Sequence, residues 1–235
     1  MPRRRVAVSP RRFSMACDTS IESGLFAAGH RLIAGADEVG RGAIAGPVVA
    51  AAVILNPFCV PVGINDSKQL TRRQRERLFA EIKNSALAFS IARIEHDEID
   101  RINIHHASLK AICEAVKALN PIPDYVLIDG KFHAPELACP QSAIIKGDGL
   151  SASIAAASIL AKVTRDAWMR EADQQYPGYG FAQHVGYNTR AHQQALSQLG
   201  PSAIHRLSFQ GVLSHQAALD LRVEETPLPS LPPIE

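Results

Sequence analysis

Apolar runs of two lengths alternate along the chain and predict a mixture of strands and helices. Short apolar runs bounded by turn residues predict strands, whereas longer stretches with apolar residues on one side predict helices. The strands are expected at residues 31–37, 48–55, 86–94, 125–129 and 143–146. The helices are expected at residues 71–83, 103–119, 151–174 and 189–199. Gly46 and Pro47 separate the first two apolar runs, so these runs predict two adjacent antiparallel strands rather than one helix.

Capping residues indicate where the helices begin. Thr71 is followed three residues later by Gln74, which is the spacing of a capping box. Asn103 and Ser151 are N-cap candidates for the next two helices. Because the helix after Asn103 lies between two strands, it predicts a crossover and a parallel pairing. The order β-β-α-β-α-β-β-α-α therefore predicts an α/β fold in which helices flank a mixed sheet.

A length of 235 residues with 46% apolar residues suits one domain with a tail at each end. We expect the domain at residues 29–222, a basic disordered tail at residues 1–28 and a proline-rich disordered tail at residues 223–235. The positive charge of the first tail comes from five arginines: Arg3, Arg4, Arg5, Arg11 and Arg12. Without that tail the chain is slightly acidic, so net charge does not by itself indicate a nucleic-acid partner.

The cysteines and the apolar stretches exclude several classes of protein. The four cysteines form no CxxC pair and have no histidine at zinc-finger spacing, which indicates neither a zinc site nor a disulfide framework. Their reduced state suits the cytoplasm. The longest apolar stretch, residues 43–55, is shorter than the roughly 20 residues of a spanning helix, so no membrane association is expected. The arginine-rich start fits a disordered tail or an organelle transit peptide, and translation from Met15 would omit its arginines.

Four acids stand at the boundaries of predicted elements: Asp37, Glu38, Asp129 and Asp148. Each one alone also fits a turn or a solvated strand end. If they converge, their mutual repulsion requires a cation, and carboxylate oxygens suit Mg²⁺ or Mn²⁺. Adjacent residues of a regular strand point to opposite faces, so Asp37 and Glu38 share a site only if the strand ends or bends between them.

The glycine-rich segment at residues 35–47 has four interpretations. It fails as a phosphate-binding P-loop, because Arg41 and Gly42 stand where lysine and serine or threonine are needed. It fits the loose GxGxxA pattern of a nicotinamide oxidoreductase, but a strand rather than a helix follows it. An ordinary glycine turn and a loop that approaches a ligand closely, with Arg41 in its middle, both stay open.

Six blocks of sequence, taken together, resemble the bacterial ribonuclease HII family over residues 31–215. The blocks lie at residues 35–55, 65–71, 125–130, 145–166, 179–187 and 205–209. The two longest contain DEVGRG and AAASILAKVTRD. This resemblance implies the ribonuclease H-like fold, with a mixed five-stranded sheet flanked by helices and a helical C-terminal part.

The resemblance implies a metal-dependent endonuclease. Asp37, Glu38, Asp129 and Asp148 fall on the family's metal-binding acids, which would hold two Mn²⁺ or Mg²⁺ ions that activate a water. The implied substrates are the RNA strand of RNA/DNA hybrids and single ribonucleotides in duplex DNA, cut on their 5′ side. The products carry a 3′-hydroxyl and a 5′-phosphate. A monomer is expected.

The same resemblance implies the residues that contact the substrate. Gly40, Arg41 and Gly42 match the loop that senses the 2′-hydroxyl, the group that distinguishes RNA from DNA. Tyr187 would stack on the sugar of the next nucleotide and favour deoxyribose there. Three lysines match basic positions suited to backbone phosphates: Lys68, Lys146 and Lys162. The chain departs from the family at Val185, where lysine is usual, so one phosphate contact is expected to be missing.

Two further interpretations share the expected fold. One is a nucleic-acid-binding module without catalysis, although all four acids are present. The other is a different nuclease, such as a junction resolvase, which only the specific sequence blocks separate from ribonuclease HII.

Overall fold

The computed structural model describes residues 17–213, which form a five-stranded sheet with helices on both faces. The strand order is β3-β2-β1-β4-β5. The strands are β1 Ile33–Val39, β2 Val48–Ile54, β3 Ala88–Ile94, β4 Tyr125–Asp129 and β5 Gln141–Ile144. β2 pairs antiparallel with β1 and β3, whereas β4 pairs parallel with β1 and β5. The expected mixed sheet is confirmed.

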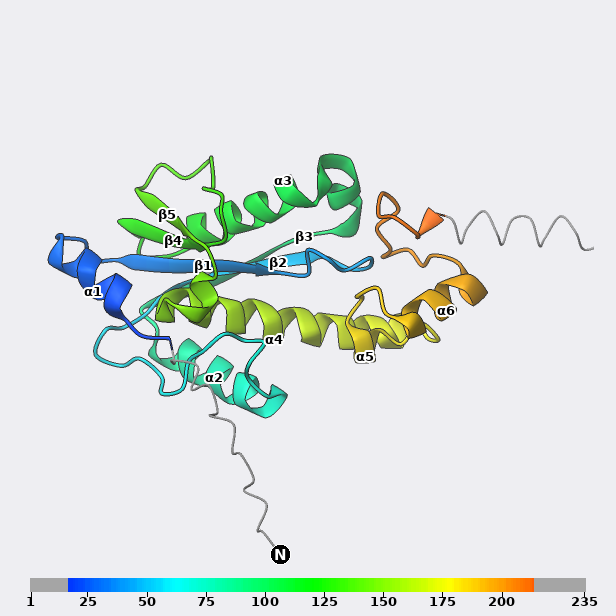
Figure 1. The fold of residues 1–235 in the computed structure, drawn as a ribbon, viewed down its shortest axis with the longest axis horizontal. Helices are drawn as coiled ribbons and strands as arrows, with labels where there is room; N and C mark the ends of the chain where they lie inside the picture. Colours follow the sequence, from blue (N-terminus) through cyan, green and yellow to red (C-terminus); the bar gives the residue numbers. More distant parts are fainter. Residues whose placement is uncertain (1–16, 214–235) are drawn as a thin grey trace, which may run out of the picture.

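Helices cover the two faces of the sheet in separate layers. They are α1 Ser20–Ala27, α2 Arg72–Ser85, α3 His96–Lys117, α4 Ala152–Gln175, α5 Phe181–His184 and α6 Arg190–Leu199, with a 3-10 turn, η1, at Gly147–Gly149. Figure 1 shows α3 on one face, α4 and α2 on the other, and α5 and α6 beyond one end of the sheet. Each layer has its own buried apolar cluster against the sheet.

Helix α4 lies unusually close to β1 because both elements present small residues where they meet. A Cβ atom at Gly35 would lie 2.1 Å from the backbone carbon of Ser153, so any larger residue would force the helix away. The alanines 155–157 of α4 are completely buried. The alanine-rich sequence of the helix is therefore a packing requirement, and it brings the helix start close to the strands that carry the acids.

Several expected helix starts are confirmed at the level of hydrogen bonds. Thr71 and Gln74 form the expected capping box of α2. The Ser151 side chain accepts from the backbone N–H of Ile154 at the start of α4, and Thr189 accepts from His192 at the start of α6. Of the described helices, none is long and apolar enough to cross a membrane.

Several boundaries differ from the expectations. Strand β1 lies two residues later than expected, at Ile33–Val39. Helix α3 begins at His96, and Asn103 instead forms a kink with φ 63°, where its side chain accepts from His105 and His106 and thus caps the second part. Strand β5 lies two residues earlier than expected, at Gln141–Ile144. The disordered tail expected through residue 28 is wrong for residues 20–27, which form α1. The other tail, at residues 223–235, and the arginines near the start lie outside the described residues.

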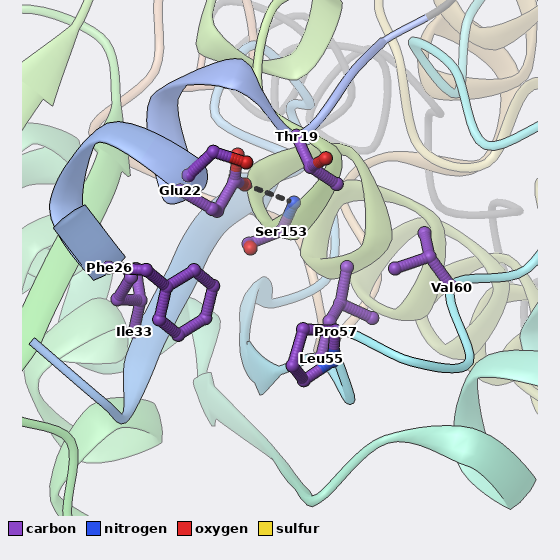
Figure 2. Close-up of a pocket in the computed structure, with 9 residues that line it drawn as sticks. Thr19, Glu22, Phe26, Ile33, Leu55, Pro57, Val60 and Ser153 are labelled. Atoms are coloured by element: carbon purple, nitrogen blue, oxygen red, sulfur yellow. Dashed lines mark hydrogen bonds between the residues drawn. The ribbon is translucent and has the colours of Figure 1, made fainter.

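Helix α1 is held because it caps the start of α4. The buried carboxylate of Glu22 accepts from the Ser151 hydroxyl at 2.7 Å and from the Ser153 backbone N–H at 2.9 Å. Figure 2 shows Glu22 reaching from α1 to Ser153 beside a small pocket. A negative charge at a helix N-terminus is stabilising, which explains why this segment is ordered.

Candidate metal centre and adjoining loop

Three carboxylates converge where β1 and β4 lie side by side. Asp37 lies in β1, Asp129 ends β4 and Asp148 lies in η1. The parallel register pairs Ala36 with Ile128, so the next residue of each strand, Asp37 and Asp129, stand at the same level. One carboxylate oxygen of each of the three aspartates lies within 4.8 Å of the others. The expected convergence of these three residues is therefore observed.

The cluster holds negative charge in a poorly solvated place. Asp37 is 5% exposed and Asp148 is 6% exposed. Burial, followed by the charges of Glu38 and Asp129, raises the pKa of Asp37 well above its usual value. Burial and the charge of Asp148 raise the pKa of Asp129. These shifts mean that the ionised cluster is destabilised until positive charge is supplied.

Backbone groups and one lysine orient the carboxylates. Asp129 accepts from the N–H of Gly147 at 2.7 Å and of Asp148 at 3.4 Å. A Cβ at Gly147 would lie 2.5 Å from Ile154 Cδ1, so a larger residue here would require the end of that buried side chain to shift. Lys68 Nζ donates to Asp148 at 2.8 Å, and its side chain is 76% exposed. Lys68 therefore offsets part of the negative charge of Asp148 at the exposed edge of the cluster. The buried carboxylate oxygens can still bind a cation.

Glu38 differs from the other three acids. Strand β1 continues through Val39, and both Asp37 and Glu38 pair with β2, so the strand neither ends nor bends between them. The two side chains therefore leave opposite faces, and Glu38 is not one of the three residues of the cluster. Its carboxylate accepts from Arg41 at 2.8 Å, although burial still raises its pKa. Its charge nonetheless acts on Asp37.

The residues fit a divalent metal ion. Three oxygen donors lie close together, two of them are almost completely buried, and their mutual repulsion is only partly offset by Lys68. Hard cations such as Mg²⁺ and Mn²⁺ take carboxylate oxygens as ligands. Asp37, Asp129 and Asp148 would hold the ion.

The glycine-rich loop after β1 lies against Tyr187, which is far away in the sequence. Ala43 and Tyr187 form an isolated antiparallel bridge, and Ile44 N–H donates to Gly186 O at 2.9 Å. A Cβ at Gly42 would lie 3.9 Å from the Tyr187 ring. The structure thus brings the loop residue Gly42 and the aromatic ring of Tyr187 together, two features that the sequence analysis could relate only through the family resemblance.

Two buried arginines, which the sequence analysis missed, hold this loop; we call Arg165 and Arg206 the arginine clasp. Arg165 donates to the carbonyl oxygens of residues 45, 47 and 185 at 2.8–3.2 Å. Arg206 donates to those of residues 41, 43 and 46 at 2.7–3.1 Å. A Cβ at Gly40 would lie 2.2 Å from Arg165 Nε, so glycine there makes room for the clasp. Burial lowers the pKa of Arg206 to about 9.

The remaining predicted contact residues are less closely gathered. Lys146 is exposed and precedes η1 with φ 58°. Lys162 donates to Asp166 one turn further along α4 at 2.8 Å, so it has a partner within its own helix. Val185 ends α5 with φ 44°, a conformation that β-branched residues rarely adopt, and its carbonyl accepts from Arg165.

Comparisons with known proteins show what this chain is similar to. The family model described as Ribonuclease HII matches residues 34–212. The Ribonuclease HII of Ruegeria pomeroyi is 53% identical over 195 residues, which cover 83% of this chain and 83% of that protein. The Ribonuclease HII of Geobacter sulfurreducens is 55% identical over 188 residues, which cover 80% of this chain and 86% of that protein.

Solved structures share the fold at lower sequence identity. The ribonuclease H2 from Pyrococcus horikoshii has a TM-score of 0.69 and 24% identity, with 82% of this chain and 99% of that chain covered. A Bst-RNase HIII in complex with Mn²⁺ has a TM-score of 0.63 and 18% identity, with 79% of this chain and 69% of that chain covered.

Proposed function

Because this chain belongs to the ribonuclease HII family and is a metal-dependent endoribonuclease, we propose that it hydrolyses the RNA strand of RNA/DNA hybrids and nicks duplex DNA on the 5′ side of single ribonucleotides. The products are a 3′-hydroxyl and a 5′-phosphate. One observation carries the proposal: Asp37, Asp129 and Asp148 converge within 4.8 Å. Glu38, the residue after Asp37, is joined by Arg41 to the glycine-rich loop.

The cluster supplies the charge that phosphodiester hydrolysis needs. Two divalent cations bound at these carboxylates would make a water nucleophilic and neutralise the charge that develops on the leaving oxygen. Mg²⁺ and Mn²⁺ both suit the donor set, and a related RNase HIII was solved with Mn²⁺. Glu38 contributes its charge beside the cluster, because its charge acts on Asp37 and the charge of Asp129 acts on Glu38.

The protein's own residues orient the substrate. Backbone groups of Gly40, Arg41 and Gly42 approach the 2′-hydroxyl, because Gly42 carries no side chain that would keep a ribose away from the loop. Tyr187 stacks on the sugar that follows the scissile bond. Lys68, which pairs with Asp148, contacts one backbone phosphate. Lys146 is exposed and contacts a second phosphate. Lys162 would have to leave Asp166 to serve the same purpose.

The decisive experiment uses duplex DNA that contains one ribonucleotide. The wild-type protein, incubated with Mn²⁺ or Mg²⁺, is expected to nick this duplex on the 5′ side of the ribonucleotide. The Asp129→Asn variant is expected to be inactive, because it loses one charged oxygen donor of the cluster. Asp97→Asn makes the same chemical change at an exposed position of α3 and serves as the matched control. Absence of a metal-dependent nick by the wild type, or full activity of Asp129→Asn, would contradict the proposal.

A further inference from the structure

A chain of two buried histidines leads from the C-terminal loop to the backbone of Tyr187. Ser202 N–H donates to His205 Nδ1 at 2.8 Å. His205 Nε2 lies 3.0 Å from His192 Nε2, and His192 Nδ1 lies 3.0 Å from the Tyr187 carbonyl oxygen. We call these four residues, Ser202, His205, His192 and Tyr187, the histidine relay.

The backbone groups at the two ends of the relay assign the protons between them. His205 Nδ1 has two partners at 2.8 Å, the backbone N–H and the hydroxyl of Ser202. The N–H can only donate and the hydroxyl can also donate, so His205 Nδ1 accepts and the proton of the neutral ring is on Nε2. A backbone carbonyl can only accept, so His192 Nδ1 carries the proton and His192 Nε2 accepts from His205. Every ring nitrogen then has a partner, and both rings are neutral. Burial, before any other cause, lowers the pKa of both histidines to about 4, which agrees with two neutral rings.

Aromatic side chains seal the relay from water. The Phe181 ring meets the His192 ring edge to face at 5.4 Å and lies 5.6 Å from the His205 ring. The His184 ring stacks on His192 at 4.3 Å. His192 is 0% exposed and His205 is 1% exposed. Neither histidine can touch a nucleic acid, so any effect of their side chains on the substrate is indirect. The side-chain hydrogen bonds lead to Tyr187, whereas the backbone of His205 pairs with Ala45 of the glycine-rich loop.

The relay acts at the place where Tyr187 meets the glycine-rich loop. His184 Nδ1 accepts from Gly186 N–H at 3.2 Å, and Gly186 O accepts from Ile44 N–H. The backbone on both sides of the Gly186–Tyr187 peptide is therefore held by histidine side chains and by the loop. A shift of this backbone would move the Tyr187 ring relative to Gly42, which it approaches closely.

We propose that His205, acting through His192, is a positioning residue that sets the placement of Tyr187 and thereby the preference for a deoxyribose after the ribonucleotide. This inference rests on the proposed function. Tyr187 can orient the sugar only if its own backbone is held in place. Removal of the buried hydrogen bond from His192 to the Tyr187 carbonyl oxygen would loosen that backbone. The relay requires that both histidine rings keep their neutral tautomers. Aromatic side chains of similar size would not be sufficient.

The kinetic test compares two substrates: duplex DNA with one ribonucleotide and a uniform RNA/DNA hybrid. His192→Ala is expected to lower the ratio of kcat/KM for the first substrate to that for the second by about tenfold, the value of one buried hydrogen bond. His192→Asn keeps an amide N–H near the position of Nδ1 and is expected to restore most of the ratio. His106→Ala, at an exposed position of α3, is the matched control and should leave the ratio unchanged.

A double-mutant cycle separates positioning from general destabilisation. In the Tyr187→Ala background, His192→Ala and His205→Ala are expected to cause no further fall in the ratio, because their effect passes through Tyr187. His205→Gln, which can still donate to His192, should retain more of the ratio than His205→Ala. An equal fall in the Tyr187→Ala background would overturn the proposal.

Nitrogen NMR of the full-length protein tests the relay without any turnover. At neutral pH, His192 should carry its proton on Nδ1 and His205 on Nε2. The opposite tautomer at either residue, or a protonated ring, would overturn the relay. A wild-type protein with these tautomers that cuts neither substrate would contradict the proposed function and the role in specificity, but not the hydrogen-bond chain.

Discussion

The carboxylate cluster and the support of the glycine-rich loop differ in how their buried polar groups are satisfied. In the cluster, Asp37, Asp129 and Asp148 crowd like charges together, and burial raises the pKa of the first two. In the loop support, Arg165 donates to three backbone carbonyls and His192 is a neutral link between two partners. The first region has repulsion that a ligand can relieve. The second has most of its hydrogen bonds already made, although Arg206 Nη2 is buried without a partner among the described residues.

This difference separates chemistry from geometry in the molecule. A repelling cluster gains free energy when cations bind, so it is suited to hold metal ions. A network whose hydrogen bonds are mostly made gains little from a ligand, and it holds the loop and Tyr187 in one arrangement. Removal of a charge should therefore stabilise the first region without metal, whereas removal of a donor should destabilise the second.

The largest effect is expected from Asp37→Asn in the cluster. Activity should fall by more than about 100-fold. Loss of a residue that only hydrogen-bonds to a metal ligand costs up to about 100-fold, and Asp37 is itself expected to be a ligand. The metal-free variant should nonetheless melt at a higher temperature than the metal-free wild type, because one buried like charge is gone. Thermal melts with and without Mn²⁺ measure both changes. A lower melting temperature without metal would argue against stored repulsion.

Arg165→Lys tests the opposite region and should cost stability. A lysine cannot reproduce the fork that reaches the carbonyls of Ala45, Pro47 and Val185, so buried acceptors are left unpaired at a cost of about 2–3 kcal/mol. The midpoint of unfolding in denaturant measures the loss. Arg72→Lys, at an exposed ion pair with Glu76, is the matched control and should leave the midpoint unchanged. Equal midpoints for Arg165→Lys and wild type would refute the clasp.

The two regions should also respond oppositely to pH. The folded pKa of His192 and His205 is about 4, below the ordinary 6.5, so their contribution to stability is complete above pH 6.5 and is lost as the pH falls toward 4. The neighbouring His184 and His96 add repulsion once charged. The raised pKa of Asp37 has the opposite sign, because without metal its ionisation costs stability as the pH rises.

Unfolding midpoints of the wild type and His205→Gln between pH 7 and pH 4 test the histidine part, with the cluster unchanged in both proteins. The wild type should lose more stability than the variant over this range, because it has one more histidine with a lowered pKa. Parallel pH profiles of the two proteins would contradict the assignment of neutral histidines.

The smallest effect is expected from Val185→Lys beside the loop support. A lysine there would add one phosphate contact, so the dependence of binding on salt concentration should become steeper by about one unit of log–log slope. Binding of a ribonucleotide-containing duplex to the catalytically inactive Asp129→Asn background, at several salt concentrations, measures the slope. An unchanged slope would mean that residue 185 does not face the phosphates.

Local patterns were sufficient for most of the fold. The capping box at Thr71 and the cap at Ser151 are formed where the sequence indicated, because capping depends on residues three positions apart. Asn103, the third cap candidate, lies at a kink inside α3 instead of at its start. The helix between β3 and β4 correctly indicated a crossover that ends in a parallel pairing, but β4 pairs with β1 and not with β3. Helix α1 was missed because its order depends on Glu22 contacting α4, which is more than a hundred residues away in the sequence.

The sequence by itself determined the strands, the capped helices, the family blocks and the residue types of the cluster, because these depend on short spacings along the chain. Only the tertiary structure decided that Asp37 joins the cluster while Glu38 lies on the other face, since that depends on β1 continuing regularly to Val39. It also decided the roles of Arg165 and His192. Their hydrogen-bond partners lie in segments that only folding brings together, so no local pattern distinguishes them from ordinary polar residues.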